Sequence, residues 1–178
     1  MSKEVRYTFT NNFVGLVINQ GVNILIAVIV TPILFQNLGS INYGLVELAF
    51  SIFMLISIFV SYGYHLNGPK RISLVNLINN ENRLINEIIS LRLFIAAIIV
   101  ILFIITILNT NLFENYRLII IFSIPILISE AIHPVFYLQG KNKLFTLSKL
   151  NALSKVIYLV LILMFIKRYS DAYRVNLF

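Results

Sequence analysis

Five long apolar segments divide this sequence, and they constrain its fold more than any other feature. The clearest occupies residues 91–108, where Arg92 and Thr106 are the only polar residues. The others occupy residues 13–35, 43–66, 118–138 and 144–166. A helix crosses the hydrocarbon core of a membrane, about 30 Å thick, with roughly 20 apolar residues. We therefore predict an all-α polytopic integral membrane protein with about five transmembrane helices, forming a single membrane domain over residues 1–178.

Composition supports this class. Hydrophobic residues make up 59% of the chain, charged residues 12%, and the mean hydropathy is +0.90. Soluble domains typically have about 25% charged residues. The first apolar segment is too long for the core of a signal peptide, so we expect it to be retained as a membrane span.

The distribution of Lys and Arg predicts the orientation, because cytoplasmic loops are enriched in these residues. With a cytoplasmic N-terminus, the outer loops hold only Arg117. The cytoplasmic segments then hold Lys3, Arg6, Lys70, Arg71, Arg83, Arg92, Lys141 and Lys143. The tail after the fifth segment, with Lys167, Arg168 and Arg174, would lie outside, against this rule. An odd number of spans and this tail lead us to expect a chain truncated before a sixth span.

Residues 69–90 separate the second and third apolar segments. Apolar residues recur there at helical spacing among charged ones, starting after Pro69. This pattern predicts either an amphipathic helix at the membrane surface or a solvated extension of the third span. The sequence leaves both possibilities open.

Several kinds of chemistry are not expected. The chain has no cysteine and only two histidines, His65 and His133, so we expect no disulfide, metal site or cofactor. It has no glycine-rich nucleotide loop and no Ser-His-Asp pattern, so we do not expect an enzyme. Aromatic and basic residues do not alternate as on a nucleic-acid-binding face, so no nucleic-acid partner is expected.

Two lysines lie in the fifth apolar segment. The uninterrupted apolar run at residues 156–166 is too short to cross a membrane, so a span must include Lys149 and Lys155. A charge at the centre of a bilayer costs about 2.5–3.5 kcal/mol on insertion scales. Either these lysines extend toward the cytoplasm, or they form a cationic wall for an anionic group such as a phosphate. On the second interpretation Lys155, Lys149 and the neighbouring Tyr158 are candidate substrate-binding residues.

The first apolar segment has a stripe of small and polar residues at intervals of four. The stripe is bordered by Gln20 and consists of Gly15, Asn19, Asn23, Ala27 and Thr31. It predicts either close packing and hydrogen bonding between helices or the wall of a wet passage for hydroxyl-rich cargo. For the second case the candidate substrate-binding residues are Asn19, Gln20 and Asn23.

Two acidic residues and a histidine also lie within the apolar segments. Glu130 is followed by His133 and Pro134, and a proline there leaves a backbone carbonyl that protein or water must satisfy. Glu130 is then either neutral or paired with a cation, with Lys155 the expected partner when no substrate is bound. We name Glu130, His133 and Glu47 as candidates for ion or proton coupling. The alternatives are a structural histidine and, for Glu47, a carboxylate that reaches the membrane surface.

A series of short motifs resembles the polysaccharide flippases, which transport O-antigen or capsule repeat units within the multidrug/oligosaccharidyl-lipid/polysaccharide exporter superfamily. The motifs, in order, are Gln20-Gly21-Val22-Asn23, Thr31-Pro32-Ile33-Leu34, Leu38-Gly39, Tyr43-Gly44, Tyr62-Gly63-Tyr64-His65-Leu66, Lys70-Arg71-Ile72-Ser73, Phe136-Tyr137-Leu138-Gln139-Gly140-Lys141-Asn142-Lys143 and Leu150-Asn151 with Ser154-Lys155. The resemblance covers the whole chain but only the N-terminal portion of the family. Near the fourth segment the chain departs from the family pattern, with His133-Pro134 where a Trp is common.

The resemblance implies part of a two-lobed helical fold that works by alternating access in the bacterial cytoplasmic (inner) membrane. It implies as cargo an undecaprenyl-pyrophosphate-linked oligosaccharide and, as further partners, membrane lipids and the polysaccharide polymerase and glycosyltransferase machinery. An N-terminal portion alone would be inactive. A multidrug-type exporter of the same superfamily and an accessory membrane assembly protein are the alternatives.

Overall fold

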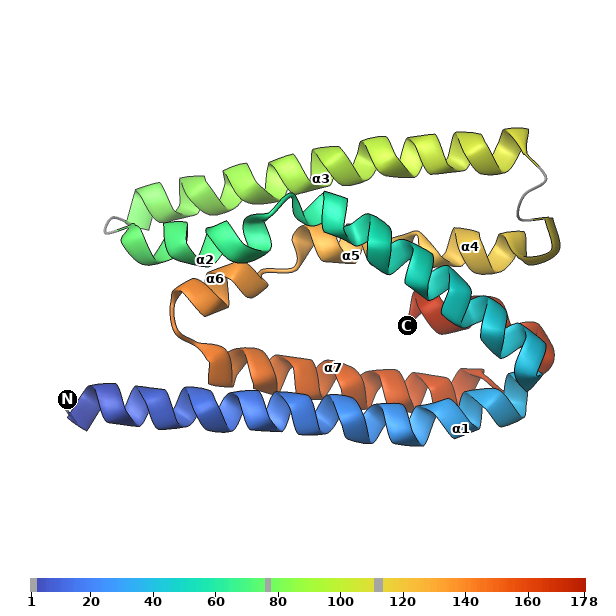
Figure 1. Ribbon diagram of the computed structural model, residues 1–178, viewed down its shortest axis with the longest axis horizontal. Helices are drawn as coiled ribbons and strands as arrows, with labels where there is room; N and C mark the ends of the chain where they lie inside the picture. The colour runs from blue at the N-terminus through green and yellow to red at the C-terminus, as the bar shows by residue number, and fades with distance from the viewer. Residues whose placement is uncertain (1–2, 76–77, 111–113) are drawn as a thin grey trace.

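The computed structural model describes residues 3–75, 78–110 and 114–178. These residues are almost entirely helical and contain no strand (Figure 1). Four helical stretches are long and apolar enough to cross a membrane: Thr10–Leu74, Asn80–Asn109, Arg117–Gly140 and Leu144–Phe165. The prediction of an all-α polytopic membrane protein is therefore confirmed.

The first two expected segments form the two arms of one bent helix, α1 (Lys3–Ser61). The bend is at Gly39, whose φ of 74° and ψ of 166° lie outside the helical range. Only glycine adopts such a positive φ readily, and a Cβ here would also lie 2.9 Å from the ring of Tyr169. Beyond the bend the second arm runs back along the molecule (Figure 1). Two arms within one helical stretch explain why four stretches are counted where about five spans were expected.

The segment between the second and third apolar regions has two parts. Tyr62 and Gly63, with φ of 46° and 72°, separate α1 from the short helix α2 (Tyr64–Leu74). The helix α3 then runs without interruption over Ile78–Asn109. The first part of this region is thus a separate helix, and the second part extends the third span.

The fourth apolar segment is broken into short helices. After the 3₁₀ turn η1 (Glu114–Tyr116) it forms α4 (Arg117–Ser123), α5 (Pro125–Ile132) and α6 (Val135–Gly140). The breaks fall at Pro125 and Pro134, because proline has no N–H to continue the helical hydrogen bonds.

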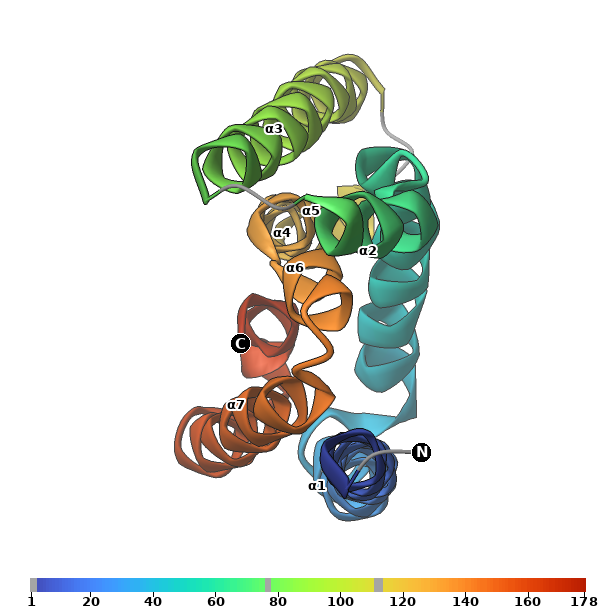
Figure 2. The same cartoon turned by 90° about the vertical axis from the view of Figure 1, so that its left-hand side faces the viewer.

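The helix α7 (Leu144–Phe165) lies along the first arm of α1 (Figures 1 and 2). The chain then folds back as a 3₁₀ helix, η2 (Tyr169–Leu177), which packs against α1 and α4. Asn176 Nδ2 donates hydrogen bonds to Val46 O at 3.1 Å and to Ser123 Oγ at 2.9 Å. These residues form the tail expected after the fifth span, and the side of the membrane on which it lies stays a prediction.

Apolar side chains lie both inside the bundle and on its surface. Leu38, Phe53 and Ile162 are fully buried, whereas Val28 and Phe94 are 66% and 65% exposed. Many other large apolar side chains of the long helices are also exposed. Such a surface suits contact with lipid chains and would be unfavourable in water.

Candidate functional site

A cluster of small and polar groups joins the first arm of α1 to α7. Ser148 Oγ donates to Gly15 O at 2.6 Å. Asn151 Nδ2 donates to Asn19 Oδ1 at 2.6 Å and to Asn23 Oδ1 at 3.2 Å. A Cβ on Gly15 would lie 2.9 Å from Phe145 Cα, so a glycine is what allows the two backbones to approach this closely.

This cluster supports the packing interpretation of the stripe in α1. The amides of Asn19 and Asn23 are half-buried and bonded to α7, as expected for hydrogen bonds between membrane helices. Gln20 is exposed and takes no part in the cluster. A substrate-binding role for these three residues stays a prediction.

Lys155 lies on the face of α7 that continues this cluster. It is four residues beyond Asn151 and three before Tyr158, which places all three side chains on one side of the helix. Lys155 is half-buried as a residue, and its ammonium lies 5.6 Å from the centre of the Tyr158 ring. Among the described residues, no carboxylate lies within ion-pair distance of it.

Lys149 occupies a different face of the same helix. Six residues separate the two lysines, which turns them about 120° apart at 100° per residue. Lys149 is exposed and its ammonium lies 4.6 Å from the centre of the Phe145 ring. The structure therefore does not join Lys149 and Lys155 into one cationic wall, and the substrate roles of both remain predictions.

The second arm of α1 brings Glu47 toward this region. The side chains of Thr31 and Glu47 neighbour the hydroxyl of Tyr43. Tyr43 and Tyr158 both pack against the same buried apolar cluster, so the start of the second arm lies near this part of α7. Glu47 itself is exposed.

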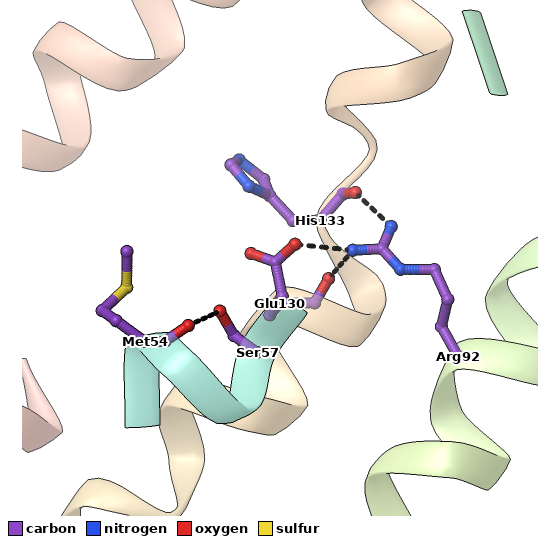
Figure 3. A network of polar contacts seen from close by, with 5 residues as sticks. All are labelled: Met54, Ser57, Arg92, Glu130 and His133. Atoms are coloured by element: carbon purple, nitrogen blue, oxygen red, sulfur yellow. Dashed lines mark hydrogen bonds and ion pairs between the residues drawn. The ribbon is translucent and has the colours of Figure 1, made fainter. Parts of the chain in front are cut away.

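A second polar site lies where α3 meets the break between α5 and α6 (Figure 3). Arg92 Nη2 contacts a carboxylate oxygen of Glu130 at 2.9 Å, and it also donates to Glu130 O. Arg92 Nη1 donates to His133 O at 3.2 Å. Glu130 O would bond the N–H of residue 134 in an intact helix, but Pro134 has none. The sequence predicts that a backbone carbonyl before Pro134 needs a partner. That carbonyl is Glu130 O, and Arg92 is its donor.

The structure corrects two expectations at this site. We expected Lys155 to pair with Glu130, but the partner is Arg92. We also counted Arg92 among the loop cations, whereas its side chain is buried, with 4% of the residue exposed. The imidazole of His133 points away from the guanidinium, and only the backbone of this residue takes part (Figure 3). Ion or proton coupling through Glu130, His133 and Glu47 stays a prediction.

Sequence reasoning did not single out Arg92 and Ser148 as residues that bond one helix to another. One signal for Arg92 was available, since this single cation and the single acid Glu130 each interrupt an apolar segment. Ser148 had no comparable signal, because its bond to Gly15 O depends on how α7 rotates toward α1.

These features together define a multi-pass membrane protein with amide, hydroxyl and ionic groups held between its helices. Residues 9–177 match the model of a family described as polysaccharide biosynthesis protein. The chain therefore belongs to the polysaccharide biosynthesis protein family.

One curated relative is named "Putative O-antigen transporter", from Escherichia coli (strain K12). It is 24% identical over 170 residues, which cover 93% of this chain and 40% of the relative. The chain thus spans less than half the length of that protein. No solved structure matches the chain.

Proposed function

We propose that this chain forms the first helices of a flippase that moves lipid-linked oligosaccharide across the bacterial cytoplasmic membrane by alternating access. The observation that carries this proposal is the half-buried Lys155, which has no acidic partner among the described residues. A cation in a membrane helix is stable where a counter-charge or a polar cavity compensates it. The phosphate groups of a lipid-linked sugar would supply that counter-charge.

The neighbouring groups support the same substrate class. Asn151 and Tyr158 flank Lys155 on its helix face, and amide and hydroxyl groups are suited to bind sugar hydroxyls. Membership of the polysaccharide biosynthesis family and similarity to an O-antigen transporter point in the same direction. We propose an undecaprenyl-pyrophosphate-linked O-antigen or capsule repeat unit as cargo, received from the glycosyltransferase machinery and passed to a polysaccharide polymerase.

The test compares two lysine variants in the intact protein that contains this chain. Lys155→Gln removes the charge near Tyr158, and Lys149→Gln removes the exposed charge on the other face. We expect Lys155→Gln to lower surface polysaccharide at least about tenfold, which corresponds to losing one contact to a charged group. Lipid-linked oligosaccharide should accumulate in the cytoplasmic leaflet, and Lys149→Gln should behave like the unmodified protein.

Membrane insertion is measured in parallel by the amount of folded protein in the membrane fraction. Unchanged export by a well-inserted Lys155→Gln variant would overturn the substrate role of this lysine. Equal losses with both variants would also contradict it, because Lys149 lies outside the proposed site.

A further inference from the structure

The short helix α2 and the turn before it form an open pocket of about 430 Å³. The turn supplies Tyr62 and Gly63, and α2 supplies Tyr64, Asn67, Lys70 and Arg71. The opposite face of α2 is closed, since Gly68 and Ile72 are buried against α6. The pocket therefore faces outward from a helix that is anchored on its other side.

The positive charge in this pocket is not neutralised. The acids of the neighbouring helix α3 already have partners: Glu81 pairs with Lys141 at 2.6 Å, and Glu87 pairs with Arg83 at 3.0 Å. No acid lines the pocket, and neither Lys70 nor Arg71 forms an ion pair with a described residue. Two neighbouring cations that line a pocket without an ion-pair partner favour an anionic ligand.

The remaining lining suits a lipid rather than a free ion. Leu74 lines the pocket and is 69% exposed, and Leu66, on the same outward side, is 79% exposed. Tyr62 is 66% exposed and lies beside Tyr64, the first residue of α2; exposed tyrosines are common where a membrane meets water. Figure 1 places α2 at the same end of the molecule as the start of α1 and the turn between α6 and α7. The segments at this end of the molecule are those for which the sequence predicts an excess of positive charge.

We propose that this pocket binds the phosphodiester head group of an anionic membrane phospholipid. Lys70 and Arg71 contact the phosphate, the Asn67 amide and the tyrosine hydroxyls contact the polar part of the head group, and Leu74 contacts the upper part of an acyl chain. The proposal is independent of the flippase function, because none of these residues belongs to the region around Lys155.

The experiment uses the purified protein in detergent, with native mass spectrometry to count bound phosphatidylglycerol. The double variant Lys70→Gln/Arg71→Gln should bind about 25-fold less, since each basic residue near an anionic lipid surface contributes about fivefold. Lys143→Gln removes an exposed cation from the turn before α7, outside the pocket, and should leave binding unchanged. Phosphatidylcholine, which has no net charge, should bind weakly to all forms.

Circular dichroism checks that each variant is folded, and the single variants replace the double variant if it is not. Each single variant should then bind about fivefold less phosphatidylglycerol than the unmodified protein. Equal binding of phosphatidylglycerol by the double variant and by Lys143→Gln would overturn the proposal. Displacement of phosphatidylglycerol by an equal concentration of inorganic phosphate would overturn it too, because the ligand would then be a free anion.

Discussion

At the scale of single residues, Arg92 donates to the carbonyl that Pro134 leaves without a helical partner. The same guanidinium pairs with the Glu130 carboxylate and bonds His133 O, so one side chain holds both ends of the break. The guanidinium carbon of Arg92 lies 5.9 Å from the centre of the Phe136 ring, and Phe136 is on the far side of that break. Arg92 thus stabilises a non-helical backbone in a region where water is scarce.

Replacing this arginine should destabilise the protein. Arg92→Met keeps the aliphatic stem but removes every donor, which leaves two backbone carbonyls and a carboxylate without partners. We expect the free energy of unfolding to fall by at least about 1–3 kcal/mol, the cost of leaving a single buried polar group unsatisfied, because three groups lose their partner. The measurement is a denaturant titration followed by circular dichroism. Arg83→Met, which breaks the exposed pair with Glu87, is the control and should cost less than about 1 kcal/mol. Equal losses of unfolding free energy in Arg92→Met and Arg83→Met would show that the buried position of Arg92 does not matter.

At the scale of elements, the first arm of α1 and α7 form the most extensive helix pair. Close approach at Gly15 and hydrogen bonds from Asn151 hold the pair together. Close backbone approach and interhelical hydrogen bonds are both typical of membrane helices. Lipid tails are as apolar as leucine, so burial of apolar side chains alone gives little preference for contact with protein over lipid.

Adding one methyl group at position 15 should separate these helices. Gly15→Ala would place its Cβ against the backbone of Phe145 and should lower the free energy of unfolding by about 1–3 kcal/mol. Gly21→Ala, in the same arm, has open space around its new Cβ. It should be neutral or stabilising by up to about 1 kcal/mol. A thermal unfolding series in detergent measures both, and a tolerated Gly15→Ala would argue against tight packing here.

The amide cluster should contribute a smaller amount. Asn151→Leu removes the hydrogen bonds to Asn19 and Asn23, and each interhelical bond in a membrane is worth about 0.6 kcal/mol. We expect a loss of about 1 kcal/mol in the same unfolding experiment. Ser154→Ala removes only a bond within α7, to Leu150 O, and should have almost no effect. A neutral Asn151→Leu variant would favour the alternative in which these amides serve a substrate.

At the scale of the whole molecule, the bend at Gly39 sets the arrangement of the spans. It turns the second arm of α1 back toward the end of the molecule where α1 begins, so α2 and the start of α1 lie at one end (Figure 1). The chain contains no cysteine, so single cysteines introduced at chosen positions can report which side of the membrane each end faces.

Cysteine labelling in intact cells should separate the two ends. Lys70→Cys and Lys143→Cys are expected to be protected from a membrane-impermeant reagent, because basic ends face the cytoplasm. Ile41→Cys, at a position 79% exposed beside the bend, and Thr110→Cys should be labelled from outside. Labelling of Ile41→Cys and Lys70→Cys from the same side would show that the two arms of α1 do not cross the membrane separately.

Sequence by itself determined the class of this protein and the need for a partner at the proline break. Hydropathy and helical length require the long segments to span a membrane, and the missing N–H of Pro134 follows from covalent structure alone. Tertiary structure decided which groups meet: Arg92 with Glu130, and Asn151 with two amides of α1. The physical reason is that an apolar helix faces lipid or protein at similar cost, so hydropathy leaves the neighbours and rotation of each helix undetermined.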